Sequence, residues 1–461
     1  MIEQFYARSP VFLQNIYISI YGYYWKRRRY GGCFSEKLKE FKQHENFSEE
    51  QWIAYQTFEL RKLLIHSYTT VPFYRKKYTE YGFTIQDFEN FELEDLQKLP
   101  YLEKDELRKY GTTTLLSNKR GKGKFYNSSG STGTPTQIYF SKKFHQTWSA
   151  LYELRVRNWA GVNYKLPRAM IGGRRVILSD KPKPPYFRYN KAESQAYFSA
   201  YHISDNTAKE YVLGLQKSKA TYLVGYAMSI YLLSQSIRKQ NLKAPKLKAV
   251  LTSSEKLTTT MRTIIENTFQ CKVFDAYSGV EACGLISENK KGELLFSPDS
   301  GIMEVLDSNG KNLNYGKSGE VVATGFLNYD QPLIRYRIGD SVKLSENQKT
   351  FSGSKMLKID EIEGRIEDVI IGSKGQKMVR FHGIFVGIPS IIMAQVIQKT
   401  LNQIEIKLVV ENSYETNFEK VMIDRIKSQL GEVLINFSYV NEIEKTTNGK
   451  YKAVISNLKN G

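Results

Sequence analysis

The sequence predicts an α/β fold with a large N-terminal domain and a small α+β domain at the C-terminus. Three observations predict it. Residues 248–276 alternate strand, helix and strand, which is typical of parallel sheets covered by helices. Residues 301–351 change to short strands and turns, which indicates a β-rich subdomain. After Gly364 the pattern is strand, strand, helix, strand, enough for a small separate domain.

The first two hundred and fifty residues are predicted to be mainly helical, with few strands. Residues 50–110 form helices broken at Pro72 and Pro100, because 51–66 carries apolar residues at helical spacing. Further helices are expected at 146–159, 206–219 and 228–240. A strand region is expected at 169–178, followed by an irregular piece with three prolines.

After residue 248, helices and strands are predicted from a helix-capping residue and from alternating apolar residues. Residues 248–253 and 272–276 read as strands, and Thr258 caps a helix that ends at Phe269. Short strands are expected at 302–306, 320–323 and 333–338. Residues 403–410 partly alternate, with Ile404, Ile406 and Leu408 on one face, and 417–430 has the spacing of an amphipathic helix.

Composition limits the class of protein. The chain has 461 residues, 41% hydrophobic and 13% aromatic, so it is globular with a large core. The formal net charge of +20 predicts attraction to anions such as nucleotides, acidic sugars or anionic lipid. No nucleic-acid-binding module accompanies the charge, so nucleic acid is not an expected partner. Three widely spaced cysteines and five scattered histidines form no metal or disulfide pattern, which favours a cytoplasmic location.

The N-terminal segment 11–25 is apolar and aromatic, and the basic run 26–29 follows it. It is too short and too polar to span a bilayer, and it lacks the order of a secretory signal. Two interpretations stay open. The segment is an N-terminal helix packed on the main domain, or it rests on the inner face of an anionic membrane as a peripheral contact.

The most informative stretch is the Ser/Gly/Thr-rich loop at 128–136, between strand-like runs at 124–126 and 137–140. Such a loop can turn backbone N–H groups and hydroxyls toward a polyphosphate. It is not a Walker loop, because no Gly-Lys-Ser/Thr ending is present, and it is not a dinucleotide fingerprint. A flexible surface connection is the alternative for this composition.

Five motifs in a fixed order resemble those of the adenylate-forming superfamily. They are 128–136, 252–255 together with 275–281, 332–340, 364–368 and 446–450. Residues 334–337 and the absence of a large insertion resemble the phenylacetate–CoA ligase-like group. Residues 13–32 and 68–75 resemble its CapK branch, which is associated with capsular and other surface polysaccharide biosynthesis. The Cys and His that phenylacetate-type ligases often carry are not evident in 287–298.

The resemblance implies an adenylate-forming ligase that uses ATP and Mg²⁺, with a role for each motif. The residues that would hold the phosphates are Ser128, Ser129, Gly130, Ser131, Thr132, Gly133 and Thr136. The adenine side would be formed by Ser253, Glu255, Tyr277 and Ser278, with the ring of Tyr277 flat on the base. Taken alone, Tyr277 would be assigned to the core.

The resemblance assigns the remaining site residues to metal, ribose and catalysis. Glu281 would hold Mg²⁺, and Asp340 would accept hydrogen bonds from the ribose hydroxyls. Arg365 would donate to ribose or phosphate, and Lys450 would swing in to stabilise the α-phosphate. Lys450 would lie on a mobile lid domain, 367–461, that rotates about Asp368 against an adenylation domain, 1–366. Surface or turn positions are the alternatives for Glu281, Asp340 and Lys450.

Two classes of function follow. In the first, the enzyme adenylates a carboxylic acid and passes the acyl group to an amine, hydroxyl or thiol acceptor. The preferred product is an amide or ester of a saccharide intermediate, and a uronic acid or acidic glycan is a candidate substrate. The alternative within this class is an acyl-CoA ligase, which would use CoA as the acceptor. In the second, the chain is a non-catalytic nucleotide-binding scaffold of a polysaccharide assembly complex. His202, Tyr222, Tyr226 and Ser253 are pocket candidates by position only.

Overall fold

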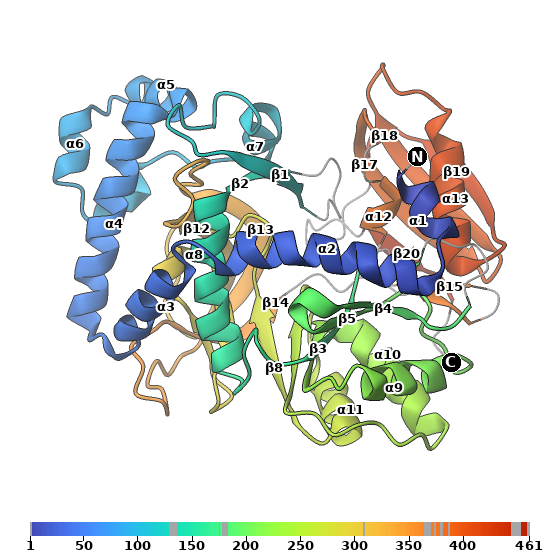
Figure 1. Ribbon diagram of the computed structural model, residues 1–461. Helices are drawn as coiled ribbons and strands as arrows, with labels where there is room; N and C mark the ends of the chain where they lie inside the picture. The colour runs from blue at the N-terminus through green and yellow to red at the C-terminus, as the bar shows by residue number, and fades with distance from the viewer. Residues whose placement is uncertain are drawn as a thin grey trace.

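The computed structural model describes residues 2–128, 136–174, 176–177, 183–307, 309–363, 370–372, 375–378, 381–385, 388–443 and 453–458. Within these residues the fold consists of one large mixed sheet with helices around it and a smaller C-terminal sheet that stands apart from it (Figure 1). The α/β prediction is therefore confirmed.

The large sheet has twelve strands. In spatial order they are β11 (Gly301–Leu306), β12 (Ser318–Gly325), β13 (Tyr336–Leu344), β14 (Lys358–Glu363), β10 (Leu294–Phe296), β9 (Ile286–Glu288), β8 (Lys272–Tyr277), β7 (Ala249–Ser253), β6 (Tyr222–Tyr226), β3 (Arg168–Gly172), β5 (Gln195–Ser199) and β4 (Phe187–Asn190). The run from β8 to β5 is parallel, and its other neighbours are antiparallel. The predicted β-rich part, β11–β14, is the antiparallel half of this same sheet.

Helices surround this sheet. The N-terminal ones are α1 (Ile2–Arg8), α2 (Val11–Tyr30), α3 (Phe34–Gln43), α4 (Glu49–Thr70), α5 (Pro72–Glu80), α6 (Ile85–Glu89) and α7 (Lys104–Tyr110). Those that follow are α8 (Lys142–Tyr152), α9 (Ala208–Lys217), α10 (Ala227–Lys239) and α11 (Thr259–Phe269). Two caps explain predicted boundaries: Pro72 opens α5, and the Thr258 side chain accepts from the backbone of Met261 at 3.2 Å.

Within the described residues, three smaller sheets complete the fold: two hairpins, one of them β15 (Ile370–Ile371) with β16 (Lys377–Met378), and a four-stranded sheet. A hairpin of β1 (Gly123–Asn127) and β2 (Gln137–Ser141) flanks the Ser/Gly/Thr-rich loop. The C-terminal sheet has the order β19 (Leu434–Tyr439), β18 (Gln403–Val410), β17 (Ile391–Thr400), β20 (Val454–Ser456). It packs with α13 (Phe418–Leu430), and beside it lie α12 (His382–Phe385), β15 and β16. Ile404, Ile406 and Leu408 are fully buried on one face of β18, as their alternation predicts.

Three predicted boundaries were wrong. The strand expected at 169–178 is β3 and ends at Gly172. The helix expected at 146–159 begins earlier, and at Glu153–Asn158 it continues as a π-helical segment. The strand expected at 333–338 begins only at Tyr336, because Arg335 adopts a left-handed backbone (φ 47°) that no strand accommodates.

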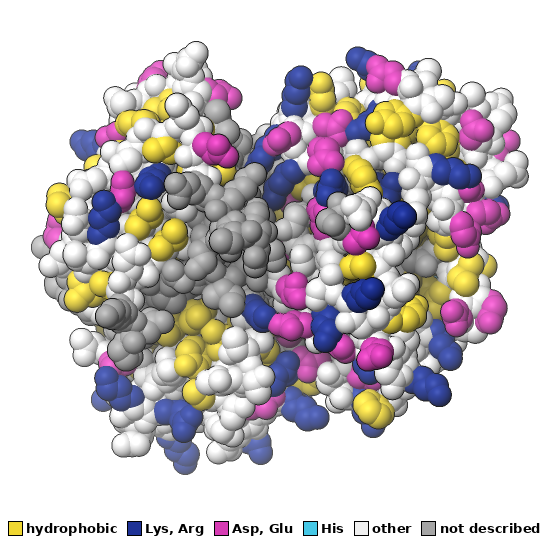
Figure 2. All heavy atoms as spheres, turned by 180° about the vertical axis from the view of Figure 1, so that it is seen from behind, with side chains coloured by type: hydrophobic (Ala, Val, Ile, Leu, Met, Phe, Trp, Pro, Cys, Tyr) yellow, Lys and Arg dark blue, Asp and Glu magenta, His cyan; other side chains and the backbone are white. Residues whose placement is uncertain are grey.

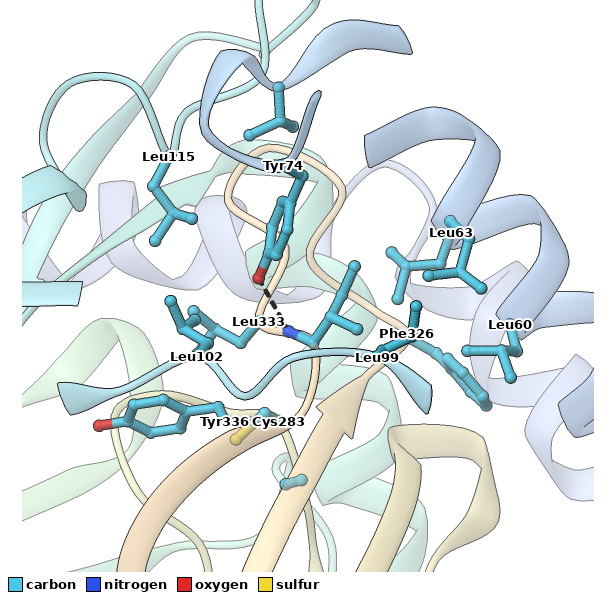
Figure 3. Packing of buried hydrophobic residues seen from close by; sticks show 14 of the residues in the cluster. Leu60, Leu63, Tyr74, Leu99, Leu102, Leu115, Cys283, Phe326, Leu333 and Tyr336 are labelled. Carbon is cyan, nitrogen blue, oxygen red and sulfur yellow. Dashed lines mark hydrogen bonds between the residues drawn. The ribbon is translucent and has the colours of Figure 1, made fainter. Parts of the chain in front are cut away.

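A large buried cluster joins the N-terminal helices to the sheet (Figure 3). Leu60 and Leu63 from α4 and Tyr74 from α5 pack toward Tyr336 of β13 and Cys283, which follows β8. The hydroxyl of Tyr74 accepts a hydrogen bond from the backbone N–H of Ile334 at 3.0 Å and donates to the carbonyl of Pro332 at 3.0 Å. The helical region 1–110 thus supports the segment that leads into Asp340.

Candidate active site

The carboxyl ends of the parallel strands meet at one edge of the large sheet. In the strand register, Gly172 of β3 stands beside Ser199 of β5, and Tyr226 of β6 stands beside Ser253 of β7. Tyr277 is the last residue of β8, the next strand. Loops at such an edge are the usual ligand sites of parallel α/β sheets.

Tyr277 and Asp340 meet at this edge. The hydroxyl of Tyr277 donates to Oδ2 of Asp340 at 2.8 Å, across 63 positions of sequence. Burial, together with the Asp340 carboxylate, raises the pKa of Tyr277 well above its usual range, so the phenol stays protonated and remains the donor. The hydrogen bond fixes the carboxylate that the sequence assigns to ribose.

Asp340 lies at a β-bulge and not in a turn. Between β12 and β13 the pairing passes from Glu320–Ser341 to Val322–Arg337, so the segment from Ile338 to Asp340 faces the single residue Val321. Gly339 permits this with φ 83°, a backbone that glycine adopts freely. A bulge redirects the side chain beside it, which is how Asp340 comes to face Tyr277 from within a strand.

Thr136 and Glu281 form the second pair. The hydroxyl of Thr136 donates to Oε1 of Glu281 at 3.2 Å, across 145 positions. A Cβ at Gly279 would lie 2.3 Å from Oε2 of Glu281, so a side chain there would displace this carboxylate. The following residue, Ala282, has φ 48°, an uncommon conformation for alanine that tends to occur at functional sites.

The base of the Ser/Gly/Thr-rich loop is closed by hydrogen bonds. The backbone N–H of Ser128 donates to the carbonyl of Thr136 at 2.8 Å, and the N–H of Thr136 donates to Oγ of Ser128 at 2.9 Å. The hydroxyl of Ser128 is therefore part of this closure. The other five predicted phosphate ligands, Ser129 to Gly133, lie outside the described residues.

The adenine-side residues differ in what they contact. Oε2 of Glu255 accepts from the backbone N–H of Met228 at 2.9 Å, in the first turn of α10. This capping contact occupies a carboxylate that the sequence assigns to nucleotide binding. Ser253 is the last residue of β7, and the backbone of the next residue, Ser254, is left-handed (φ 71°). The hydroxyl of Ser278 donates to the carbonyl of Gly279 at 3.2 Å. Nucleotide contacts of these three residues stay predictions.

A network of polar side chains involves β8, the strand that ends at Tyr277. Asp275 accepts from the Thr252 hydroxyl at 2.7 Å, and its backbone N–H donates to Glu288 at 3.0 Å. Glu288 in turn pairs with Arg262 at 2.7 Å. Burial raises the pKa of Asp275 to about 6, although the hydrogen bond from Thr252 lowers it in part. The strand that presents Tyr277 therefore contains a carboxyl that titrates just below neutral pH.

Arg335 is a structural residue that sequence reasoning passed over. Its buried guanidinium donates to both oxygens of Glu304, at 3.0 and 2.8 Å, and to the carbonyls of Gln97 and Leu99. Burial raises the pKa of Glu304, while the Arg335 charge opposes the shift. A left-handed arginine before the bulge is anchored by these bonds, so the segment leading to Asp340 is fixed from beneath. In the sequence, the position of Arg335 within the motif 332–340 was the only indication of this structural role.

The other predicted residues are divided between this edge, the opposite end of the sheet and the part of the chain outside the described residues. Tyr222 is the first residue of β6, at the opposite end of that strand, and its hydroxyl donates to the carbonyl of Asn163 at 3.1 Å. The Tyr226 hydroxyl lies close to Gly173, where an added Cβ would be 2.7 Å from it, so Tyr226 lines the edge. His202 bonds Ser199 at the end of β5, 2.7 Å apart. Arg365, Asp368 and Lys450 lie outside the described residues.

Within the described ranges, no cluster of three or more metal-ligating side chains occurs. Glu281 and Thr136 nevertheless suit Mg²⁺, which takes one or two carboxylate ligands and completes its shell with waters and substrate phosphates. The carboxylate stands at the end of the phosphate-type loop, where those phosphates would lie. This donor set fits the metal that the family resemblance implies.

Three comparisons with known proteins show what this chain is similar to. The model for the CapK C-terminal domain matches residues 370–457. Protein CapK of Staphylococcus aureus is 28% identical over the full length of both chains. The phenylacetate–coenzyme A ligases of Pseudomonas putida and Escherichia coli are 25% and 26% identical, each over 71% of this chain and 73% or 74% of their own.

Solved structures agree in fold. A 2-hydroxyisobutyryl-CoA ligase in the postadenylation state matches with a TM-score of 0.56 at 16% identity, over 90% of this chain and 92% of its own. The chain thus has the fold of adenylate-forming ligases, and its resemblance to that superfamily, to the phenylacetate–CoA ligase-like group and to CapK is confirmed. These relatives support an enzyme of the adenylate-forming ligase class.

Proposed function

We propose that this chain, a CapK-like relative of the adenylate-forming ligases, activates a carboxylic acid with ATP and transfers the acyl group to an acceptor. A carboxylate oxygen would bond to the α-phosphate while pyrophosphate leaves, and the acceptor would then displace AMP. The observation that carries the proposal is the meeting of four motif residues, Thr136, Glu281, Tyr277 and Asp340, at the carboxyl edge of the sheet.

The site must bring two anions together, so it must neutralise charge without attacking the substrate. Glu281 would hold Mg²⁺ against the phosphates, and Thr136 and the loop hydroxyls would hold the phosphates themselves. Asp340, held by Tyr277, would accept bonds from the ribose hydroxyls. Binding of an adenylate and CoA by the solved 2-hydroxyisobutyryl-CoA ligase, which shares the fold, supports a nucleotide at this edge.

The C-terminal part would act as a mobile lid. The proposed division is 1–366 and 367–461, with Asp368 as hinge, Arg365 as a further donor to ribose or phosphate, and Lys450 as the cation on the α-phosphate. A compact ammonium on a flexible stem suits that last role. Closure would exclude water from an acyl-adenylate that hydrolyses easily. The separate C-terminal sheet supports this division.

For the acceptor, we propose amide or ester formation on a saccharide intermediate in surface polysaccharide biosynthesis. Full-length similarity to CapK and the missing Cys/His pattern in 287–298 support it. The net charge of +20 suits a uronic acid or another acidic glycan as substrate. Thioester formation with CoA is the alternative, supported by the phenylacetate–CoA ligase relatives. The proposal places the protein in the cytoplasm, peripheral to the inner face of the membrane.

The decisive experiment is Mg²⁺-dependent exchange of pyrophosphate into ATP, screened over aryl, fatty, amino and uronic acids. Lys450→Ala is expected to abolish exchange while ATP still binds, because the ammonium acts mainly in the transition state. Lys452→Ala, two residues away, is the matched control and should retain exchange. No exchange with any acid, together with ATP binding, would instead support the non-catalytic scaffold.

The acceptor is tested with the acid that stimulates exchange. It is supplied with CoA and, separately, with amino acids and amino sugars, and the products are identified by mass spectrometry. We expect an amide or ester of the amine or sugar. Efficient thioester formation with CoA, and no product with any amine or sugar, would establish the CoA ligase alternative.

A further inference from the structure

Helix α2 crosses the near face of the molecule (Figure 1). Every exposed residue of α2 before Lys26 is apolar or aromatic: Phe12, Ile16, Ile20, Tyr21, Tyr23 and Tyr24. Phe12, Ile16, Ile20, Tyr23 and Arg27 recur at helical spacing and form one stripe, which we name the α2 stripe. An ordinary surface helix has the opposite arrangement, so the orientation needs an explanation.

The polar residues of α2 are used inside the protein. The side chain of Asn15 accepts from the backbone N–H of Tyr189 at 2.9 Å, and that of Ser19 accepts from the N–H of Lys191 at 2.9 Å. Gln14, which is buried, accepts from Arg188. These partners belong to β4, the edge strand of the large sheet, and to the residues just after it. The helix therefore covers the sheet edge with its polar side chains, and its apolar stripe is left to face outward.

The helix is held firmly in this orientation. A Cβ at Gly22 would lie 2.2 Å from the side chain of Asn190, so helix and strand touch at van der Waals distance. At its far end Arg28 is buried and bonds the carbonyl of Phe140 at 2.7 Å, while Trp25 packs edge-on against His145. A rigid helix loses little conformational entropy when its outer face binds something.

The surroundings of the stripe are basic. The sequence contains no Asp or Glu from residue 4 to residue 35. Arg27 lies over the ring of Tyr23, Lys124 lies over the ring of Tyr24, and Lys26 bonds the carbonyl of Ala192. An open groove of about 640 Å³ runs between the stripe and β4, lined by Ile16, Ile20 and Tyr23 on one side and by Lys191 on the other. On the opposite face of the molecule basic and acidic side chains are interspersed (Figure 2).

We propose that the α2 stripe and its basic surroundings dock the protein on an anionic phospholipid bilayer. Aliphatic side chains would enter the boundary between head groups and acyl chains, and tyrosines suit the head-group level. Lysine and arginine beside them would attract anionic lipid. A second copy of the chain fits less well, because twofold pairing would oppose the same basic residues. Within the described residues no helix is long and apolar enough to cross the bilayer, so this contact is peripheral.

The test is sedimentation of the full chain with vesicles of phosphatidylcholine alone and with added phosphatidylglycerol. We expect binding to the anionic vesicles that weakens with salt. Ile16→Gln/Ile20→Gln should reduce binding to the anionic vesicles at least about tenfold, because the apolar area that would be buried in the bilayer is lost. Phe351→Gln/Leu434→Gln is the matched control, since these side chains are also exposed, at 82% and 61%, but lie elsewhere. Glutamine preserves the helix, and thermal unfolding checks the fold.

A second pair of variants tests the charge. Lys26→Glu/Arg27→Glu should lower anionic-vesicle binding at least about tenfold. Lys290→Glu/Lys291→Glu, an exposed basic pair away from α2, changes the net charge equally and should have little effect. Equal losses in test and control variants, or equal binding to neutral vesicles, would overturn the proposal. So would a stable dimer in light scattering that Ile16→Gln/Ile20→Gln dissociates, since the stripe would then join two copies.

This inference goes beyond the proposed ligase reaction and stands separately from it. Pyrophosphate exchange in solution should be unchanged in Ile16→Gln/Ile20→Gln, because neither side chain touches the candidate site. Loss of vesicle binding with normal exchange supports membrane docking, whatever acid or acceptor the enzyme uses.

Discussion

The pair Tyr277–Asp340 and the pair Thr136–Glu281 lie at the same edge of the large sheet, but different contacts hold them. Asp340 belongs to a strand whose preceding segment is anchored by buried Arg335 and by Tyr74. Glu281 follows β8 in a loop and, among the described residues, accepts a hydrogen bond from the Thr136 hydroxyl. The proposed ribose ligand is therefore built into the core, whereas the proposed metal ligand is held by a loop contact.

The different contacts of Asp340 and Glu281 predict different effects of substitution. Substitutions beneath Asp340 should change stability first and nucleotide binding second. Substitutions at Glu281 should change catalysis without changing stability. The following predictions test that division, beginning with the largest expected effect.

Arg335→Met should lower the free energy of unfolding by about 3–5 kcal/mol, because Glu304 would stay buried without its partner. Urea denaturation measures it. Arg337→Met is the matched control two residues away, since that side chain is 40% exposed and pairs with Glu320. The control should lose at most about 1 kcal/mol. Equal losses would mean that Arg335 does not anchor the segment.

Glu281→Gln should reduce pyrophosphate exchange by about 10²–10³-fold, a loss of the size seen when one preorganised electrostatic contact to a transition state is removed. The free energy of unfolding should stay within about 0.5 kcal/mol of the original chain. Glu346→Gln, at an exposed carboxylate, should leave exchange intact. A large loss of stability would place Glu281 in the scaffold instead of the metal site.

Asp275→Asn should flatten the dependence of stability on pH. The pKa of Asp275 is about 6 in the folded chain, above its ordinary value of 3.8, so the folded state binds the proton more tightly. This contribution is fully present below about pH 4 and is lost as the pH rises through 6, a change of about 3 kcal/mol. Urea denaturation from pH 4 to 7 should show a smaller decrease in the variant. Asp424→Asn, at an exposed position on α13, should keep the original slope.

Asp340→Ala should weaken ATP binding by about 1.5–3 kcal/mol, the value of hydrogen bonds to a charged acceptor. Calorimetric titration with ATP measures the dissociation constant, and Asp360→Ala, at an exposed site on β14, is the control. An unchanged dissociation constant for ATP would mean that Asp340 does not contact the nucleotide and has only a structural role in the bulge.

Tyr277→Phe should have the smallest effect, about 1 kcal/mol in ATP binding, because it removes the hydrogen bond from Tyr277 to Asp340 and leaves the ring in place. A loss as large as that of Asp340→Ala would mean that the hydroxyl itself contacts the nucleotide.

The sequence by itself determined the elements whose signals are local. Periodicity predicted α4, β18 and α13, and the side chain of Thr258 marked the start of α11, because caps and alternating burial depend on a few neighbouring residues. The order of five loop motifs predicted the family. The roles of Lys450, Arg365 and Asp368 stay predictions.

Only the tertiary structure decided how distant segments meet. The bulge that carries Asp340 depends on pairing between β12 and β13, and the left-handed Arg335 depends on Glu304 and on two carbonyls far away in sequence. Gln14, Asn15 and Ser19 look like interruptions of an apolar run until β4 supplies their partners. The physical reason is the same in each case: a polar or strained residue is stable only with a specific partner, and that partner lies outside any local window.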